Sequence, residues 1–263
     1  MVVQLSSTIP TKKEPVVTWE KLPADFLLPD EPVESIQQPP LAAALTEALG
    51  TCDRLQPEML IASNFGIVAT VNQKMVVKAP DWLYVPRVLP VAEGVIRRSY
   101  TPSMEGDRVA IAMEFLSETD AGEYSVRAKF PYGKLYCYEQ ILQIPTYIIF
   151  DPYEVDLEVR RLQQGQYILE SATAEGRYWI PEINLFLGIW HGTRLGLTMH
   201  WLRWWDEAGN LLLWSSEQAE LERQRAEQER QRAEDAIASL DTERQRSEAL
   251  AAKLRELGID PNS

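Results

Sequence analysis

Three pieces of sequence between Asp81 and Asp151 constrain the fold of this 263-residue chain more than any other feature. Two of them, KAPDWLYVP (78–86) and RVAIAMEFLSE (108–118), have the composition of strands, and each supplies a carboxylate. The third, FPYGKLYCYEQILQIPTYIIFDP (130–152), predicts a helix with a lysine near its start, followed by a buried apolar strand. This succession of strands and helices indicates an α/β fold.

Asp81, Glu114 and Lys134 are the candidate catalytic residues within these pieces. Two carboxylates on adjacent strands offer hard oxygen ligands, which Mg²⁺ and Mn²⁺ prefer. A nearby ammonium group can orient an attacking water and neutralise charge that develops on a phosphate. The set therefore predicts a site that binds Mg²⁺, with Mn²⁺ as the alternative, and that hydrolyses phosphodiester bonds.

The same three pieces carry a resemblance to a known family. The runs AP-D-x-L-Y-V, M-E-F-L-S-E and K-x-x-x-Y-E-x-I-L-x-I-P-x-Y-x-x-F-D-P occur in the order found in the Uma-two-type restriction endonucleases. That family belongs to the PD-(D/E)XK nuclease superfamily and was formerly a domain of unknown function. The resemblance covers roughly residues 18–190. It implies a restriction-endonuclease-like mixed sheet flanked by helices, with DNA as the substrate and RNA or another phosphodiester as the alternative.

Carried over residue by residue, the resemblance assigns roles to the three candidates. Asp81 matches the PD element, Glu114 the acidic position of the second strand, and Lys134 the lysine that opens the following helix. The superfamily pattern places lysine two residues after the acid, where this chain has Leu116. The resembling family shows the same relocation, so we expect Lys134 to fill the lysine role, with Lys129 as the next candidate.

Further contacts are predicted around this set. Glu34, in EPVESIQQPP, stands where the resembling family has a glutamate that assists at the metal. Segment 87–107 is rich in proline and glycine and predicts a long loop that contacts substrate. Its neighbourhood supplies basic side chains that either touch phosphate or form a solvated face: Arg87, Arg97, Arg98 and Arg108.

Composition limits the classes of function. The two cysteines and two histidines have no metal-ligand spacing, which argues against a zinc site and against histidine-based catalysis. The chain lacks an apolar run of membrane-spanning length and a signal-peptide pattern, so we expect a cytoplasmic protein without membrane contact. A net charge of −13 argues against strong nonspecific binding of nucleic acid, which is largely electrostatic.

The expected organisation has three parts. A flexible N-terminal lead (1–17) precedes a restriction-endonuclease-like domain with a C-terminal β extension (18–214), and a charged helical tail (215–263) follows. Within the domain, LAAALTEALG predicts a helix, and LEVRRLQQGQYILE predicts an edge hairpin. The run LTMHWLRWWDEAGNLLLW (197–214) predicts a second hairpin that turns at Glu-Ala-Gly-Asn.

The tail repeats with a period of seven residues. ERQRAEQ (222–228), ERQRAED (229–235) and ERQRSEA (243–249) predict a long charged helix and a coiled coil. An apolar seam runs only from Leu240 to Leu257. We expect a homodimer, formed through this tail or through the core. The alternative is a solvated single helix held by Glu/Arg pairs.

Two functions from different classes are compatible with these patterns. The first is a metal-dependent endonuclease that uses two carboxylates and a lysine. The second is a noncatalytic interaction protein with a nuclease-like scaffold and a coiled-coil tail that binds partners. The catalytic function requires Asp81, Glu114 and Lys134 to converge, and the scaffold function does not.

Overall fold

A mixed six-stranded sheet forms the centre of residues 1–212, the first of two units into which the computed structural model divides the chain. The structure describes residues 16–21, 37–117 and 122–256. Strands β6 and β7 pair in parallel, and the other neighbouring pairs of this sheet are antiparallel. In sheet order the strands are β2 (Leu60–Ala62), β5 (Trp82–Val85), β6 (Ile111–Phe115), β7 (Thr146–Asp151), β8 (Asp156–Gln163) and β9 (Gln166–Leu169). The predicted mixed α/β fold is confirmed, and so is the edge hairpin, which is β8–β9.

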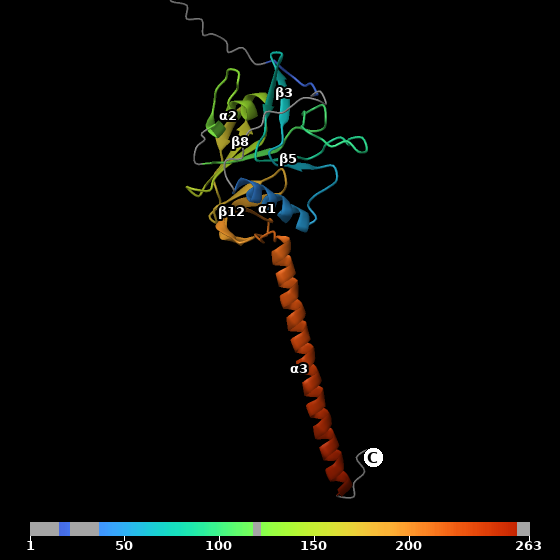
Figure 1. Cartoon of the computed structure of the whole chain (residues 1–263). Coiled ribbons are helices and arrows are strands. Elements are labelled where there is room, and N and C mark those ends of the chain that lie inside the picture. The colour runs from blue at the N-terminus through green and yellow to red at the C-terminus, as the bar shows by residue number, and fades with distance from the viewer. Residues whose placement is uncertain (1–15, 22–36, 118–121, 257–263) are drawn as a thin grey trace, which may run out of the picture. The chain divides into compact units, whose positions relative to one another are not determined.

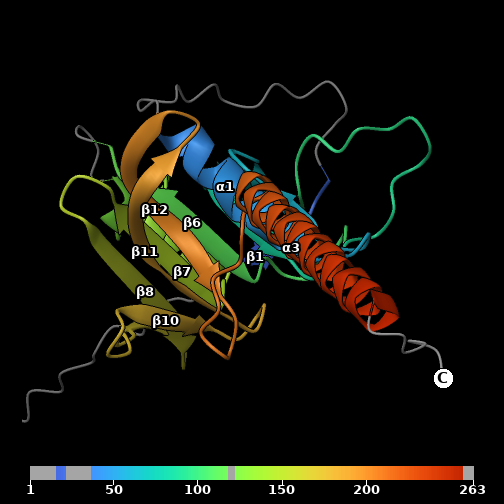
Figure 2. The same cartoon turned by 90° about the horizontal axis from the view of Figure 1, so that it is seen from below.

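Two three-stranded antiparallel sheets accompany the central sheet. They lie on opposite sides of it, one on the side of α2 and the other on the side of α1 (Figure 1). Figure 2 shows the long strands β11 and β12 beside α1 and across β6 and β7. The first sheet contains β1 (Val17–Thr18), β3 (Ile67–Val71) and β4 (Lys74–Lys78), and the second contains β10 (Arg177–Ile180), β11 (Leu185–Arg194) and β12 (Leu197–Trp205).

Helix α1 (Gln38–Thr51) packs with β12 on one side of the central sheet. Its alanines and leucines favour helix, and prolines occupy its first turn, where their missing N–H groups cost nothing. The Trp82 indole donates to Thr46 Oγ1 at 2.9 Å, and the Trp204 indole donates to the Leu45 carbonyl at 3.2 Å. These two tryptophans, whose ring centroids are 6.1 Å apart, tie β5, β12 and α1 together.

The opposite face of the sheet is covered by the connection between β6 and β7. Parallel strands need a crossover, and this one contains a short 3₁₀ turn, η1 (Gly122–Tyr124), and the helix α2 (Lys134–Tyr136), which continues into a π-helix, η2 (Cys137–Ile141). Side chains alternate along a strand, so Leu83, Val85 and Ala112 face this connection and share a core with it. Asp81 lies two residues before Leu83 and Glu114 two residues after Ala112, so both carboxyls point to this same face.

Segment 87–107 is a loop, as predicted, but its two ends are held in place. Tyr100 is fully buried and bridges to Ile67 of β3, and the Val88 and Gly106 backbones form another isolated bridge. Between these anchors the tip is exposed and carries apolar side chains, including Ile96 at 85% exposure. The loop is therefore fixed at its base and open at its tip.

The predicted second hairpin is correct in its turn but not in its extent. The chain turns at Asp206–Asn210, yet the returning segment contributes only an isolated bridge between Trp205 and Leu211. The partner of β12 along its whole length is β11 instead. The two residues between these strands, Leu195 and Gly196, have φ values of 51° and 78°, the conformation that two-residue hairpin turns require.

Some expectations concern residues whose structure is not described. Residues 1–15 of the predicted N-terminal lead and Glu34 lie outside the described residues, whereas Val17 pairs with Val71. Among the described residues, no helix combines the length and the apolarity needed to cross a membrane.

The second unit, residues 213–263, consists in its described part mainly of the helix α3 (Ser215–Glu256). None of the residues of α3 is buried. Exposed ion pairs join its turns, such as Arg230 with Glu227 at 2.6 Å and with Glu234 at 3.1 Å. Pairs of this kind stabilise a helix by only about 0.3–0.5 kcal/mol each.

A truncation at Ser215 should leave the first unit folded, because α3 buries none of its own residues and every strand that the structure describes precedes it. We expect the near-ultraviolet circular dichroism of the truncated protein to match that of the full chain. Its melting temperature should change by less than about 4 °C, the shift that roughly 1 kcal/mol produces in a domain of this size. Loss of a cooperative melting transition would contradict this expectation.

Candidate active site

Asp81 and Glu114 face each other across β5 and β6. The antiparallel register pairs Trp82 with Met113, and continuing it by one residue sets Asp81 opposite Glu114. The Phe115 backbone N–H donates to Asp81 Oδ2 at 2.6 Å, which links the Asp81 carboxylate to β6. Like charges directly opposite each other in a sheet are destabilising, so this pair needs compensating donors or cations.

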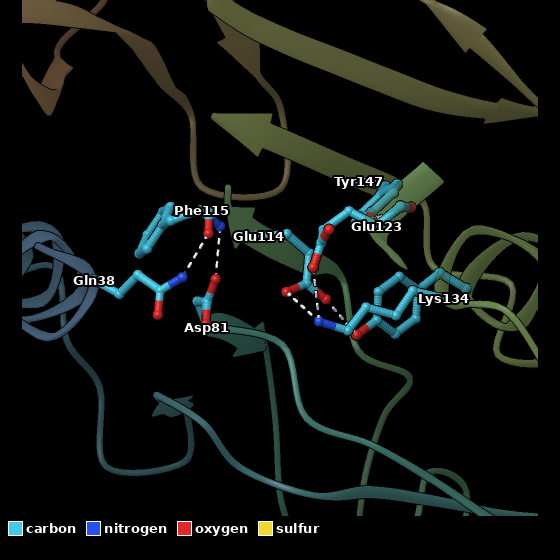
Figure 3. Close-up of polar contacts among 8 residues, drawn as sticks. Gln38, Asp81, Glu114, Phe115, Glu123, Lys134 and Tyr147 are labelled. Carbon is cyan, nitrogen blue, oxygen red and sulfur yellow. Dashed lines mark hydrogen bonds and ion pairs between the residues drawn. The ribbon is translucent and has the colours of Figure 1, made fainter. Parts of the chain in front are cut away.

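Lys134 supplies the nearest positive charge. It is the first residue of α2, and its Nζ lies 3.3 Å from Glu114 Oε2 and 3.1 Å from Glu123 Oε1 (Figure 3). The ammonium group thus bridges two carboxylates, one on β6 and the other on η1. The Glu114 side chain is 1% exposed and that of Glu123 is 8% exposed, so both ion pairs are screened little by solvent.

Tyr138 holds the second oxygen of Glu114. Its hydroxyl donates to Glu114 Oε1 at 2.8 Å, and the residue is fully buried. Tyr138 follows Lys134 by four residues, so both side chains project from the same face of the helical segment onto Glu114. The segment is a π-helix from Cys137, and such turns occur frequently at functional sites.

A close backbone approach brings Lys134 beside Glu123. A Cβ atom on Gly133 would lie 2.2 Å from the Ser125 carbonyl oxygen, so only glycine fits at this position. The Tyr136 N–H donates to the same Ser125 carbonyl at 3.3 Å. The start of α2 therefore rests directly against the chain that follows η1, which carries Glu123.

Burial dominates the electrostatics of the two carboxyls on the sheet. Desolvation raises the pKa of Asp81 to about 6, against the lowering effects of the Phe115 N–H and Lys134. It raises the pKa of Glu114 to about 8, opposed by Lys134 and reinforced by Asp81. For Lys134, burial lowers the pKa, but the charges of Glu114 and Glu123 outweigh burial, so its net pKa shift is upward and it stays protonated.

The structure thus brings Asp81, Glu114 and Lys134 together in one cluster, with Glu114 buried and the other two partly buried. Lys129, the alternative lysine, is exposed on the loop before α2. Arg97 binds Glu105 at 2.7 Å and Arg87 binds Asp107 at 3.3 Å, so both of these arginines are engaged with acids of their own loop. The sequence patterns did not identify a role for Glu123, which lies in a polar stretch without periodicity.

The donor set fits a divalent cation of the magnesium type. Among the residues that the structure describes, no three His, Cys, Asp or Glu side chains are arranged as a metal centre. Mg²⁺ does not need such a cage, because it usually takes one or two carboxylates and keeps water or substrate oxygens as its other ligands. Asp81 and Glu114 could provide those carboxylates.

The comparisons with known proteins identify a family for this chain. Residues 34–199 match the family described as "Uma2: Putative restriction endonuclease". The chain belongs to the Uma2 family. The match spans β5, β6 and the whole crossover to β7, so every residue of the cluster lies inside it. A search of curated proteins finds no match. The Uma2 family is nuclease-like by its description, which makes a nucleic acid the class of substrate that it suggests.

Replacing Asp81 with asparagine should stabilise the metal-free protein at neutral pH. The pKa of Asp81 is raised from 3.8 to about 6, so the folded state binds its proton more tightly than the unfolded state does. The wild type therefore loses stability as pH rises from about 4 through 6. At about 1.4 kcal/mol per pKa unit, Asp81→Asn should gain about 1–3 kcal/mol at pH 7 and nothing at pH 4.

Urea denaturation in EDTA at both pH values measures this difference. Asparagine keeps an oxygen for the Phe115 N–H, so the hydrogen bond is retained. Destabilisation at pH 7, or an equal effect at the two pH values, would mean that burial of the Asp81 carboxylate does not cost folding free energy.

Proposed function

We propose that the protein is a metal-dependent endonuclease that hydrolyses phosphodiester bonds of DNA, with Asp81, Glu114 and Lys134 as its catalytic residues. The observation that carries the proposal is the cluster itself. Lys134 Nζ lies 3.3 Å from a fully buried glutamate that stands opposite a second, partly buried carboxyl in the register of β5 and β6. A purely structural core would gain more from apolar side chains at these positions, because buried charges cost folding free energy.

Asp81 and Glu114 would hold one Mg²⁺ or Mn²⁺ between β5 and β6. A bound cation would supply Lewis-acid stabilisation of the negative charge that grows on the phosphate in the transition state. The β-strands fix both carboxylates, and the Phe115 N–H orients Asp81. Rigid placement of this kind is what a metal site needs from its protein.

Lys134 would contact the attacking water or the scissile phosphate. Its charge is assured, because the Glu114 and Glu123 carboxylates raise its pKa. A fixed positive charge in a buried site stabilises a transition state more than the same charge in water does.

DNA as substrate is supported by the family and opposed by the overall charge. The net charge of −13 predicts weak nonspecific affinity for the phosphate backbone. A divalent cation in the site would reduce the local repulsion. We therefore expect cleavage to depend steeply on the metal concentration and to weaken as salt rises.

Removing either carboxylate should abolish metal binding and cleavage together. Asp81→Ala and Glu114→Ala each delete a ligand, so calorimetry with Mn²⁺ should show no binding and a plasmid-nicking assay should show no product. Lys134→Ala should keep metal binding, because it removes a competing cation, while cleavage falls by roughly 10²–10³-fold.

Three outcomes would contradict the proposal. A wild type that neither binds Mn²⁺ nor nicks DNA at millimolar Mg²⁺ or Mn²⁺ would favour the noncatalytic scaffold. Full activity of Lys134→Ala would reassign the lysine role to Lys129. Unchanged metal binding in both carboxylate variants would place the metal elsewhere.

A second function is favoured by α3, which is long and has no buried residue. We propose that the tail mediates self-association or binds a partner through its last three heptads. Leu240 and Leu250 are 70% and 55% exposed and lie on the predicted seam. A neighbouring helix would bury this apolar surface. This role is compatible with catalysis, and it would be the main one if the site proves inactive.

Light scattering should show a larger species for the full chain than for a truncation at Ser215. Replacing Leu240 and Leu250 with glutamine tests the seam without shortening the chain, and it should reduce the full-length protein to the state of the truncation. Identical masses for the full chain and the truncation would remove self-association through α3 from the proposal.

A further inference from the structure

Glu123 is a third acid of the cluster, and nothing in the sequence patterns gave it a function. It lies on η1, outside the strands that present Asp81 and Glu114, and the residue is 6% exposed. One of its carboxylate oxygens, Oε1, accepts from Lys134 Nζ at 3.1 Å. The other, Oε2, is buried and has no hydrogen-bond partner among the described residues.

An unpartnered buried carboxylate oxygen is uncommon in a folded protein. Buried polar atoms are almost always hydrogen-bonded. Burial removes the water that bonded to them, and an atom that finds no other partner loses that hydrogen bond at a cost in free energy. Exceptions occur where a ligand, an ion or a catalytic step supplies the missing partner. Glu123 Oε2 therefore marks a place where a small donor is expected.

Each of the other two carboxyls of the cluster already has at least one hydrogen-bond donor. Glu114 uses Oε1 for the Tyr138 hydroxyl and Oε2 for Lys134. Asp81 Oδ2 accepts from the Phe115 N–H. At Glu123, in contrast, a donor and an acceptor lie side by side: the Lys134 ammonium and the free Oε2. A single water could accept from Lys134 and donate to Glu123 Oε2.

We propose that Glu123 is a catalytic residue, the proton acceptor for the water that attacks the phosphodiester. This inference rests on the proposed nuclease function. The water oxygen forms a bond to phosphorus, and its proton passes to Glu123 Oε2. The bond from phosphorus to the leaving sugar oxygen breaks, and that oxygen takes a proton from solvent. Glu123 then returns its proton to solvent, and no group is oxidised or reduced.

The geometry favours proton acceptance by Glu123 over direct ligation of the metal. Within the described residues, no three acids are arranged as a metal centre. The Lys134 ammonium also stands between the Glu123 and Glu114 carboxylates, bonded to both. Glu123 thus faces the lysine, on the side where the attacking water is expected.

The backbone holds Glu123 in this position. The Tyr147 hydroxyl, on β7, donates to the Glu123 carbonyl oxygen at 3.0 Å (Figure 3). The close approach of Gly133 to Ser125 fixes the same turn against the start of α2. A proton acceptor must sit within hydrogen-bond reach of the water, and both contacts limit its movement.

Glu123→Gln is the sharpest test, because it keeps the size of the side chain and removes its ability to take a proton. We expect the rate of plasmid nicking with Mn²⁺ to fall by about 10²–10⁴-fold, the usual contribution of a general base. Calorimetry with Mn²⁺ alone should give a dissociation constant within about threefold of the wild-type value, since the cation ligands are intact.

Glu182→Gln is the matched control. Glu182 is another shielded glutamate of the same unit, with a side chain 14% exposed and ion-paired to Arg161 at 2.8 Å, and it lies apart from the cluster. Its nicking rate, measured at a temperature well below its melting point, should stay within about threefold of the wild-type rate. An equal loss of activity in both variants would indicate a structural effect and overturn the proposal.

Glu123→Asp keeps a carboxylate on a shorter side chain, and it serves if the glutamine variant does not fold. It should bind Mn²⁺ normally and cleave at least tenfold more slowly than the wild type. Wild-type cleavage by either Glu123 variant would overturn the proposal, as would loss of Mn²⁺ binding, which would make Glu123 a ligand instead. If the wild type itself binds no Mn²⁺ and does not nick DNA, the proposed nuclease function fails as well.

Discussion

Two carboxyls placed opposite each other across β5 and β6 are the constraint on which the rest of the cluster depends. The register of the sheet brings Asp81 and Glu114 together, and burial, complete for Glu114 and partial for Asp81, removes much of the water that would otherwise separate their charges. Three donors hold these two carboxyls: the Phe115 N–H, the Tyr138 hydroxyl and the Lys134 ammonium. The helical crossover supplies two of these three, which explains why it covers this face of the sheet.

Apart from these polar groups, the surroundings of the cluster are apolar. Leu83, Val85 and Ala112 lie on the same face of the sheet and form a core with the crossover. An apolar surrounding strengthens each electrostatic contact, but it also makes each uncompensated charge expensive. Such a site is stable only if its negative charges are balanced by cations and hydrogen-bond donors.

The sequence was informative where local patterns control the outcome. Strand-like composition and the family motifs predicted that Asp81 and Glu114 belong to one site, and the register sets the two residues opposite each other. The helix that opens at Lys134 followed from its composition. The β11–β12 hairpin was missed because its turn, at Leu195 and Gly196, interrupts a continuous run of strand-forming residues.

Glu123 illustrates the limit of such patterns in the site itself. It belongs to a polar connection without periodicity, and its position depends on a tertiary contact, the approach of Gly133 to Ser125. No spacing rule relates an acid in such a segment to a lysine eleven residues later. The available signals were Gly133 and Tyr138. The roles of both depend on how the helix packs, since Gly133 contacts Ser125 and Tyr138 contacts Glu114.

The loop between β5 and β6 has an evolutionary consequence. Its base is pinned by Tyr100 and by the bridge between Val88 and Gly106, whereas its tip stands in solvent. Lengthening an exposed loop costs little closure entropy, and the sheet alone fixes the register of Asp81 against Glu114. Insertions, deletions and new side chains between the anchors can therefore accumulate without moving the acids. Within the Uma2 family, this tip is where we expect lineages to differ in length and sequence.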